Sequence, residues 1–473
     1  MAFALLSRGN MSGITNLFSI GSSGLFAYQK ALSVTGQNLS NVNTPGYSRQ
    51  DAVLAETSPV NGRPGQIGTG VEVTEIKRQV DIFVNQQLTL SQQQLGEFSA
   101  SNDALNTIQS LFSDTQGTTI GSALNDFFSA LQDVSTSPSD VTARTVALSA
   151  AQALVNQFHQ NDTQLTDEQH SLDQSVGQAV TDINSYTTQI AQLNNQIAQA
   201  EASGQQANDL RDERDRTLNS LSNVINISSI EDATGQVSVF TAQGQQLVSK
   251  NISHALTAVP NSSNHGFVDV DYTIGGSTST LNAVITGGRL KGLLDARDQI
   301  IPTLQGQLNT LVQQVVTQVN TQHQAGFGLD GSTGVNFFVP GGTTASTMAV
   351  AITDGRQIAA SITAAGIPGN NVNALALVNL QTTTMAGLSG MTFSGYYKTT
   401  AASIGSQADQ ANQNLKAQQL LDDQLQAHRA EVSGVSMDQE LINMMQYQRA
   451  FQAASRIVTT ADTLMQTILS LKQ

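Results

Sequence analysis

The C-terminal end of the chain carries apolar residues at intervals of seven, and this spacing restricts it to a helix that packs on several sides. Three such rows run in parallel, which is one more than the contact between two helices requires. A helix with so wide an apolar stripe needs more than one neighbour. The rows consist of Met444, Phe451, Val458 and Met465, of Tyr447, Ala454, Ala461 and Ile468, and of Ala450, Ile457, Leu464 and Leu471.

A second amphipathic helix is predicted near the N-terminus, where apolar residues recur at steps of three and four. The sequence NTPG follows this row at residues 43–46. Pro45 has no backbone donor and disfavours the helical conformation in the residue before it, while Gly46 can adopt angles closed to other residues. Asn43, Pro45 and Gly46 are therefore predicted to end the helix at a fixed place.

The two terminal helices have two possible roles. They could be ordinary core helices of one globular domain, or neighbouring copies of the chain could cover them in a polymer. Their positions at opposite ends of the chain favour the polymer, as does their low charge: residues 11–50 contain no acid and only Lys30 and Arg49 as bases. The candidate assembly interface consists of Leu25, Tyr28, Leu32, Leu39, Val42, Met444, Tyr447, Phe451, Ala454, Ile457, Val458, Ala461, Leu464, Met465, Ile468 and Leu471.

Composition narrows the class of protein. A chain of 473 residues is expected to form two to four domains. Its formal net charge of -15 argues against nucleic-acid binding through a general basic surface. The chain has no cysteine, so disulfides and thiolate metal sites are excluded.

No apolar run approaches the roughly 18 residues that a membrane span requires, so no membrane partner is expected. The apolar patch Ala2–Leu6 precedes its positive charge, Arg8, whereas a secretory signal has the opposite order. A cleaved signal peptide is therefore not expected. Residues 1–10 are either a disordered lead or the result of a start placed before the true one at Met11.

Between the ends, helical and strand patterns alternate. Residues 51–79 predict turns and short strands, and the spacing from Leu172 to Ala200 predicts a long helix. The helix that contains LRDERDR follows, and its charges are expected to form a solvated face with ion pairs within the helix. Short alternating segments then predict a β module between about Val224 and Thr286.

No catalytic, metal or cofactor site is predicted. The motif GFGLDG at residues 326–331 matches GxGxxG but follows a predicted helix rather than a strand, so a glycine turn is the simpler interpretation. The six histidines show no spacing typical of metal ligands. No pair of acids has a context that would separate the pKa values of its two members.

The two ends together resemble the axial proteins of the bacterial flagellum, a family of rod, hook and hook-associated proteins. The resemblance rests on SGLFAYQKALSVTGQNLSNVNTPGYSRQ and on SGVSMDQELINMMQYQRAFQAASRIVTTADTLMQTILSL. The YSRQ that follows NTPG, the LRDERDRTLNSLS helix and GGRLKGLLDARDQIIPTLQGQLNTL are similar to the members that form the first junction between hook and filament. Most of the chain contributes to the resemblance.

The resemblance implies a mainly α fold with inserted β structure, in which the terminal helices pair as a coiled-coil-like inner domain, a long helical bundle forms the middle domain, and an antiparallel β module faces outward. On this pattern the domains are an inner domain of 11–48 with 434–473, a middle domain of 49–223 with 289–433 and short β segments, an inserted β domain of 224–288, and the lead of 1–10.

The resemblance further implies a non-enzymatic structural protein that polymerises into a helical ring or tube. Its expected partners are other copies of itself, the hook protein below, the next junction protein toward the filament, an export chaperone on the C-terminal helix and the flagellar secretion apparatus. Its expected location is extracellular, in the flagellum. Two alternatives remain: another axial component such as a hook or distal rod protein, and a secreted adhesin or enzyme on a helical stalk.

Overall fold

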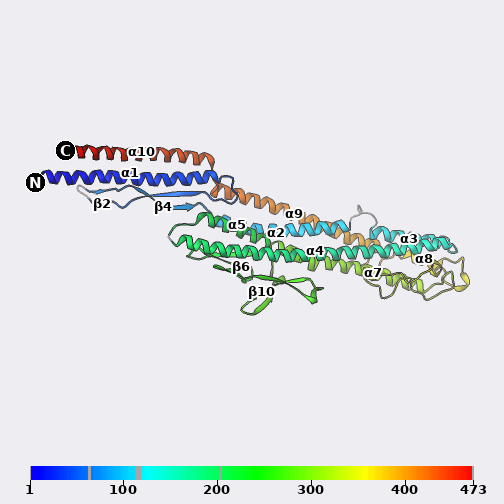
Figure 1. Ribbon diagram of the computed structural model, residues 1–473. Helices are drawn as coiled ribbons and strands as arrows, with labels where there is room; N and C mark the ends of the chain where they lie inside the picture. The colour runs from blue at the N-terminus through cyan, green and yellow to red at the C-terminus, as the bar shows by residue number, and fades with distance from the viewer. Residues whose placement is uncertain (1, 62–64, 113–118, 203, 471–473) are drawn as a thin grey trace. The chain divides into compact units, whose positions relative to one another are not determined.

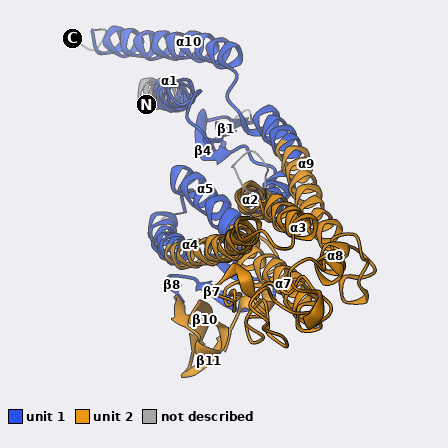
Figure 2. Cartoon of the chain, turned by 90° about the vertical axis from the view of Figure 1, so that its right-hand side faces the viewer, with its two compact units in different colours: residues 1–93, 182–255, 420–473 blue, residues 94–181, 256–419 orange. Residues whose placement is uncertain are grey.

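The computed structural model describes residues 2–61, 65–112, 119–202 and 204–470 (Figure 1). The chain forms two compact units, coloured separately in Figure 2. Unit 1 contains residues 1–93, 182–255 and 420–473, and unit 2 contains residues 94–181 and 256–419. The prediction of a mainly helical chain with inserted antiparallel β structure is confirmed.

Three long helices contribute to both units. Each passes from one unit to the other without a break, so neither unit is a continuous stretch of sequence. The helical pattern from Leu172 to Ala200 covers only the C-terminal half of α4, whereas helical patterns over residues 80–111 and 404–432 indicate nearly all of α2 and most of α9. The three helices are α2 (Ile82–Leu111), α4 (Val141–Glu201) and α9 (Phe393–Ser433).

Unit 1 contains the two terminal helices, α1 (Ala2–Ser40) and α10 (Met437–Ser470), which pack against each other (Figure 1). The helix α1 begins at Ala2, and it therefore includes residues for which the sequence predicts a disordered lead. The physical reason is that AFALL contains good helix formers and no proline, so nothing separates it from the helix that follows.

A long β-hairpin packs on α1. Its strands are paired antiparallel from Gln50 with Arg78 to Glu56 with Val71, with a bulge after Val53. The bulge adds local twist to the pair. The strands of the hairpin are β1 (Gln50–Glu56) and β4 (Val71–Arg78), and a small ladder beyond them pairs β2 (Val60–Asn61) with β3 (Gln66–Ile67).

The remainder of unit 1 combines parts of α2, α4 and α9 with α5 (Asn208–Val224) and a four-stranded sheet. The buried amide of Asn194 on α4 donates to the carbonyls of Val237 (2.7 Å) and Lys250 (2.6 Å), which attaches the sheet to the helix. The strands in spatial order are β5 (Ile227–Glu231), β6 (Val237–Thr241), β7 (Gln246–Ser249) and β8 (Ile252–Ser253).

Unit 2 is built around a cluster of buried phenylalanines. The ring of Phe127 contacts those of Phe128 (centroids 5.2 Å apart) and Phe337 (5.5 Å). Phe128 also stacks on Phe393 (5.9 Å), and Phe338 contacts Phe337 (4.9 Å). Such tilted and stacked ring pairs add to the stabilisation from burial. The helices of unit 2, besides its parts of α2, α4 and α9, are α3 (Ile120–Thr136), α6 (Arg289–Asp295), α7 (Ile301–Gln324) and α8 (Val372–Asn379).

A π-helical turn, Ala296–Ile300, joins α6 to α7. Pro302 lies two residues after the turn ends and has no N–H to donate, so a regular α-helical turn would lack a bond there. The turn places the fully buried side chain of Arg297 against α4. There it forms an ion pair with Asp173 (2.6 Å) and donates to the carbonyl of Val268 (2.9 Å).

The predicted β module at 224–288 consists of two separate sheets. Strands β5 to β8 belong to unit 1, whereas the three strands that follow belong to unit 2. Each sheet is attached to a different part of α4, through Asn194 in unit 1 and through Asp173 in unit 2, which also accepts from the backbone of Val268 (2.8 Å). The strands in unit 2 are β9 (Leu256–Pro260), β10 (Val268–Ile274) and β11 (Ser277–Thr280).

No helix in the described ranges is both long and apolar enough to cross a membrane.

The glycine motif GFGLDG begins two residues after α7 ends at Gln324, as expected of a turn. Its conformation depends in part on His323, which is buried at the end of α7. The ring Nε2 accepts from the N–H of Ala359 (3.0 Å), so Nδ1 carries the hydrogen and donates to the carbonyl of Val335 (2.7 Å). Burial lowers the pKa of His323 below its ordinary value, and the folded protein holds the ring neutral.

This pKa shift predicts a loss of stability in acid. Below the unfolded-state pKa of His323, 6.5, the unfolded chain binds a proton that the folded chain does not. The free energy of unfolding should therefore fall by up to about 1.4 kcal/mol per pH unit as the pH drops below that value. Urea unfolding followed by circular dichroism at pH 7 and pH 5.5 measures this dependence.

The variant His323→Gln lacks the titrating ring, so its pH dependence over this range should be weaker than that of the wild type. The exposed His428 provides the control. His428→Gln should keep the wild-type dependence. Equal pH dependence in all three proteins would show that His323 is not held neutral by the fold.

Candidate assembly interface

The contact between α1 and α10 contains two small residues on α1. A Cβ atom at Gly21 would lie 2.8 Å from the side chain of Val458, and one at Gly24 would lie 3.2 Å from Cβ of Ala454. Side chains at these positions would push the helices apart, so the two glycines permit the close approach. Farther along, the rings of Tyr28 and Tyr447 stack with centroids 6.5 Å apart.

Part of the predicted assembly interface is therefore covered within the chain itself. Ala454 and Ala461 are buried, and Val458 contacts α1. The other predicted residues are half-buried except Leu464, which is exposed, and Leu471, which lies outside the described residues. The half-buried ones are Leu25, Tyr28, Leu32, Leu39, Val42, Met444, Tyr447, Phe451, Ile457, Val458, Met465 and Ile468.

The most exposed apolar side chains of this helix pair lie mostly outside the predicted rows. Phe26 on α1 is 71% exposed and Met445 on α10 is 52% exposed. The heptad rows do not include these positions; the signal that could have found them is the presence of apolar residues on nearly every side of both helices. We call this set the exposed terminal residues: Leu17, Phe18, Phe26, Met437, Leu441, Ile442, Met445, Leu464 and Leu469.

The NTPG sequence forms a turn after the end of α1 at Ser40. The N–H of Thr44 donates to the carbonyl of Asn41 (2.9 Å), and the N–H of Tyr47 donates to the carbonyl of Thr44 (3.2 Å). Gly46 has a φ of +77°, in the left-handed region that favours glycine. Its neighbours Asn43 and Pro45 are exposed.

The residues after this turn link α1 to α5. Both the N–H and the hydroxyl of Ser48 donate to the carboxylate of Asp212, each at 2.8 Å. Gln50 exchanges hydrogen bonds with Asn38: its N–H donates to Asn38 Oδ1 (3.0 Å), and Asn38 Nδ2 donates to its carbonyl (2.8 Å). The side chain of Gln50 also donates to Asp209 (2.8 Å).

Arg49 links the same segment to α9 and α10. Its Nε donates to Glu440 Oε1 at 2.7 Å, and its backbone N–H donates to the carbonyl of Ser433 at 2.8 Å. The second oxygen of Glu440 accepts from Asn38 (3.2 Å). Only 1% of Glu440 is exposed, so nearly all of this charge is compensated inside the protein. We call Asn38, Ser48, Arg49, Asp212 and Glu440 the turn network.

The charges of α5 are not a solvated face, and that prediction is wrong. Asp212 and Arg214 are each 1% exposed, because both have partners outside their own helix. Arg78 on β4 pairs with Asp212 (2.7 Å) and Asp215 (2.8 Å). Arg214 pairs with Glu231 on β5 (3.0 Å).

Tyr47 completes the contacts of the turn. Its hydroxyl donates to Asn38 Oδ1 (2.9 Å). Burial raises the pKa of Tyr47 far above its ordinary value, and the nearby carboxylates of Asp209, Asp212 and Glu440 raise it further. The phenol therefore stays protonated and keeps its role as donor at any physiological pH.

The turn network predicts a specific weakness in α10. Glu440→Gln removes the charge that Arg49 requires, and hydrogen bonds to charged groups contribute about 2 kcal/mol. The docking of α10 should weaken by that amount, which corresponds to roughly 30-fold faster hydrogen exchange where α10 opens locally. Hydrogen exchange detected by mass spectrometry measures the change.

Asp438→Asn is a matched control, because it removes one charge from the same first turn of α10 at an exposed position. Both substitutions weaken the interaction with the helix dipole to a similar extent. If both variants showed the same exchange in α10, the contact between Arg49 and Glu440 would not hold the helix.

Three family models match the chain. The model described as flagellar hook-associated protein FlgK helical domain matches residues 105–338. The flagellar basal body rod FlgEFG protein C-terminal model matches residues 426–471, and the flagella basal body rod protein model matches residues 18–47. The two rod models thus cover all of α10 and the second half of α1 with the NTPG turn.

The chain is also similar to proteins named flagellar hook-associated protein 1. It is 32% identical to that of Escherichia coli over 333 residues, which is 69% of this chain and 60% of the relative, and 32% identical to that of Salmonella typhimurium over 330 residues. The chain thus spans about 60% of the length of these relatives. The Bacillus subtilis protein is 28% identical over 94% of this chain and 96% of its own length.

A solved structure has the same fold. The flagellar hook junction protein FlgK from Burkholderia pseudomallei aligns with a TM-score of 0.66 at 21% identity, and the alignment covers 73% of this chain and all of that one. The family models, the relatives and this fold agree with one another. The chain belongs to the flagellar hook-associated protein 1 family.

Proposed function

We propose that the chain is a structural axial protein of the bacterial flagellum that forms the junction between hook and filament by polymerising through α1 and α10. The observation that carries this proposal is the match to the Bacillus subtilis hook-associated protein 1 along nearly the whole of both chains. The chain has the long helices of that family, and its termini match the family models of rod proteins, which are also axial components.

The exposed terminal residues provide the physical basis for polymerisation. Single exposed apolar side chains are normal on a protein surface, but nine of them on one pair of helices favour burial against a partner. Burying each apolar side chain contributes about 1.5 to 3 kcal/mol. Neighbouring copies in a ring would cover them on every subunit, and the half-buried residues of the predicted interface would become fully buried.

The same proposal includes the other expected partners. The hook protein lies below the ring and the next junction protein lies toward the filament. Before assembly, an export chaperone covers the apolar α10, and the flagellar secretion apparatus exports the unfolded chain to the cell exterior without cleaving a signal peptide. The absence of cysteine is compatible with this route, since no disulfide has to be broken or formed on the way.

We assign no catalytic, metal or cofactor role to the chain. Within the described ranges no group of three or more histidine or acidic residues could hold a metal ion. The ionisable groups of the turn network form ion pairs and hydrogen bonds within the protein, as expected of a structural connection. The described contacts of the two sheets attach them to α4, through Asn194 in unit 1 and Asp173 in unit 2.

Phe26→Asp tests polymerisation through the terminal helices. Phe26 has little contact within the isolated chain, so the melting temperature should stay within about 2 °C of wild type. In the ring, a charge would be left in an apolar contact on every copy, at a cost of several kcal/mol each. Cells that produce the variant should make hooks without filaments, as seen by electron microscopy, and isolated hooks should lack the chain in immunoblots.

Val146→Asp provides the control, because it makes the same chemical change at an exposed apolar position on α4 in unit 2. This variant should still assemble and support filaments. Normal filaments on cells that carry Phe26→Asp would contradict the proposal that α1 forms the polymer contact.

A further inference from the structure

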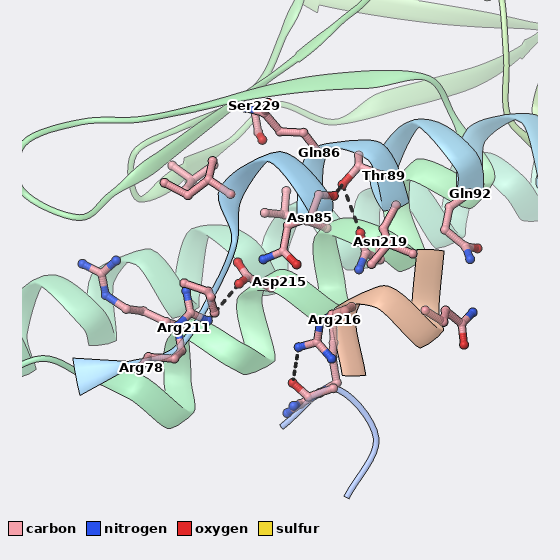
Figure 3. Close-up of a pocket in the computed structure, with 18 of the residues that line it drawn as sticks. Arg78, Asn85, Gln86, Thr89, Gln92, Arg211, Asp215, Arg216, Asn219 and Ser229 are labelled. Carbon is pink, nitrogen blue, oxygen red and sulfur yellow. Dashed lines mark hydrogen bonds and ion pairs between the residues drawn. The ribbon is translucent and has the colours of Figure 1, made fainter. Parts of the chain in front are cut away.

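A cavity of about 600 Å³ lies within unit 1 beside the N-terminal turn, which contributes Pro45 and Gly46 to its wall (Figure 3). Its remaining walls come from α2, α5, α9 and the sheet. Leu88, Leu218 and Val237 are buried and provide apolar surface inside it. The wall of the cavity thus contains buried apolar side chains as well as polar and charged ones.

Four arginines line this cavity, against two acids. Two of the four are neutralised by the protein: Arg78 pairs with Asp215 (2.8 Å), a contact visible in Figure 3, and Arg211 pairs with Glu231 (2.7 Å). Both acids of the lining are therefore engaged. The other two arginines of the lining, Arg216 and Arg429, are not neutralised by these acids.

Neither Arg216 nor Arg429 has a carboxylate partner among the described residues. Arg429 donates to the carbonyl of Gly46 (2.9 Å) and to the hydroxyl of Ser48 (3.3 Å), both uncharged. Arg216 is exposed, and its guanidinium makes no hydrogen bond or ion pair with the described residues. Its aliphatic part lies against the turn, since a Cβ at Gly46 would be only 2.6 Å from Arg216 Cδ.

We propose that this cavity binds a carboxylate-bearing segment of a second copy of the chain in the assembled ring. The inference rests on the proposed self-assembly. Each copy carries a formal net charge of -15, so neighbouring copies repel each other over most of their surface. Side-by-side packing requires local sites of opposite charge, and Arg216 and Arg429 form such a site.

Two features favour a protein segment over a small anion as the occupant. The rim carries Ile82, which is 71% exposed, and an anion would not cover this apolar side chain. The cavity also adjoins the turn at the end of α1, so it is continuous with the candidate assembly interface. A segment with one carboxylate and an adjacent apolar residue would pair with the two arginines and cover the apolar side chains of the cavity.

Charge reversal at Arg216, whose guanidinium has no partner among the described residues, tests the proposal. Arg216→Glu should reduce incorporation of the full chain onto isolated hooks at least tenfold, because its carboxylate repels that of the neighbour. Its melting temperature should stay close to that of wild type, since the substitution removes no hydrogen bond or ion pair of the described residues. Arg216→Lys keeps the charge and should restore incorporation to within about threefold of wild type.

Lys416→Glu is the matched control: it makes the same charge change at an exposed lysine without a partner in the described chain. Incorporation of Arg216→Glu equal to that of Lys416→Glu would overturn the proposal. If wild type and both control variants failed to join hooks, the proposed function itself would be wrong. The two failures are therefore distinguishable.

A cross-linking experiment identifies the occupant directly, even if Arg216→Glu folds poorly. The chain has no cysteine, so Gln86→Cys introduces a single thiol. Gln86 is exposed and lines the cavity, as Figure 3 shows. A benzophenone attached to that thiol should link to a second copy in isolated hook–junction complexes, at a peptide with an acidic residue. Links only within one copy or to the hook protein, or no links at all, would overturn the proposal.

Discussion

The contact between Arg49 and Glu440 connects the two ends of the chain to the remainder of unit 1. It joins residues 391 positions apart, and it lies where α1 has ended and α10 begins. A buried carboxylate is stable only with a cation and hydrogen bonds around it, so Glu440 requires Arg49 and Asn38 in fixed positions. The backbone N–H of Arg49 also bonds to the end of α9, so this one residue holds the end of α9 beside the start of α10.

The turn network explains why a firm helix stop is needed so near the N-terminus. If α1 continued past Ser40, Ser48 could not reach Asp212 on α5 and Arg49 could not reach Glu440. The turn at Gly46 therefore places Ser48 and Arg49 where they connect the terminal helices to the body of unit 1. The proposed polymerisation through α1 and α10 would require such a connection, because it would hold the assembled helices in place relative to the body of unit 1.

The charges of the chain have two separate roles. Within each copy the buried pairs, such as Arg297 with Asp173 and Arg78 with Asp212, fix how helices and sheets are attached. Between copies, the large net negative charge opposes association. Exposed cations such as Arg216 would reduce this repulsion where two copies meet. The apolar surface of α1 and α10 supplies attraction, whereas the charged groups would determine which arrangement of copies is tolerated.

The sequence by itself determined the helical class, the end of α1 and the apolar character of both termini, because periodicity and the properties of proline and glycine act over a few residues. It also indicated the family, through the motifs at both ends. Only the tertiary structure decided which apolar residues face the other terminal helix and which stay exposed, since Gly21 and Gly24 lie opposite Ala454 and Val458 across some 400 positions. The charges of α5 looked like a solvated face because their partners on β4, β5 and the N-terminal turn are distant in sequence. Burial of Asp212 and Arg214 depends on those partners, and no local pattern contains that information.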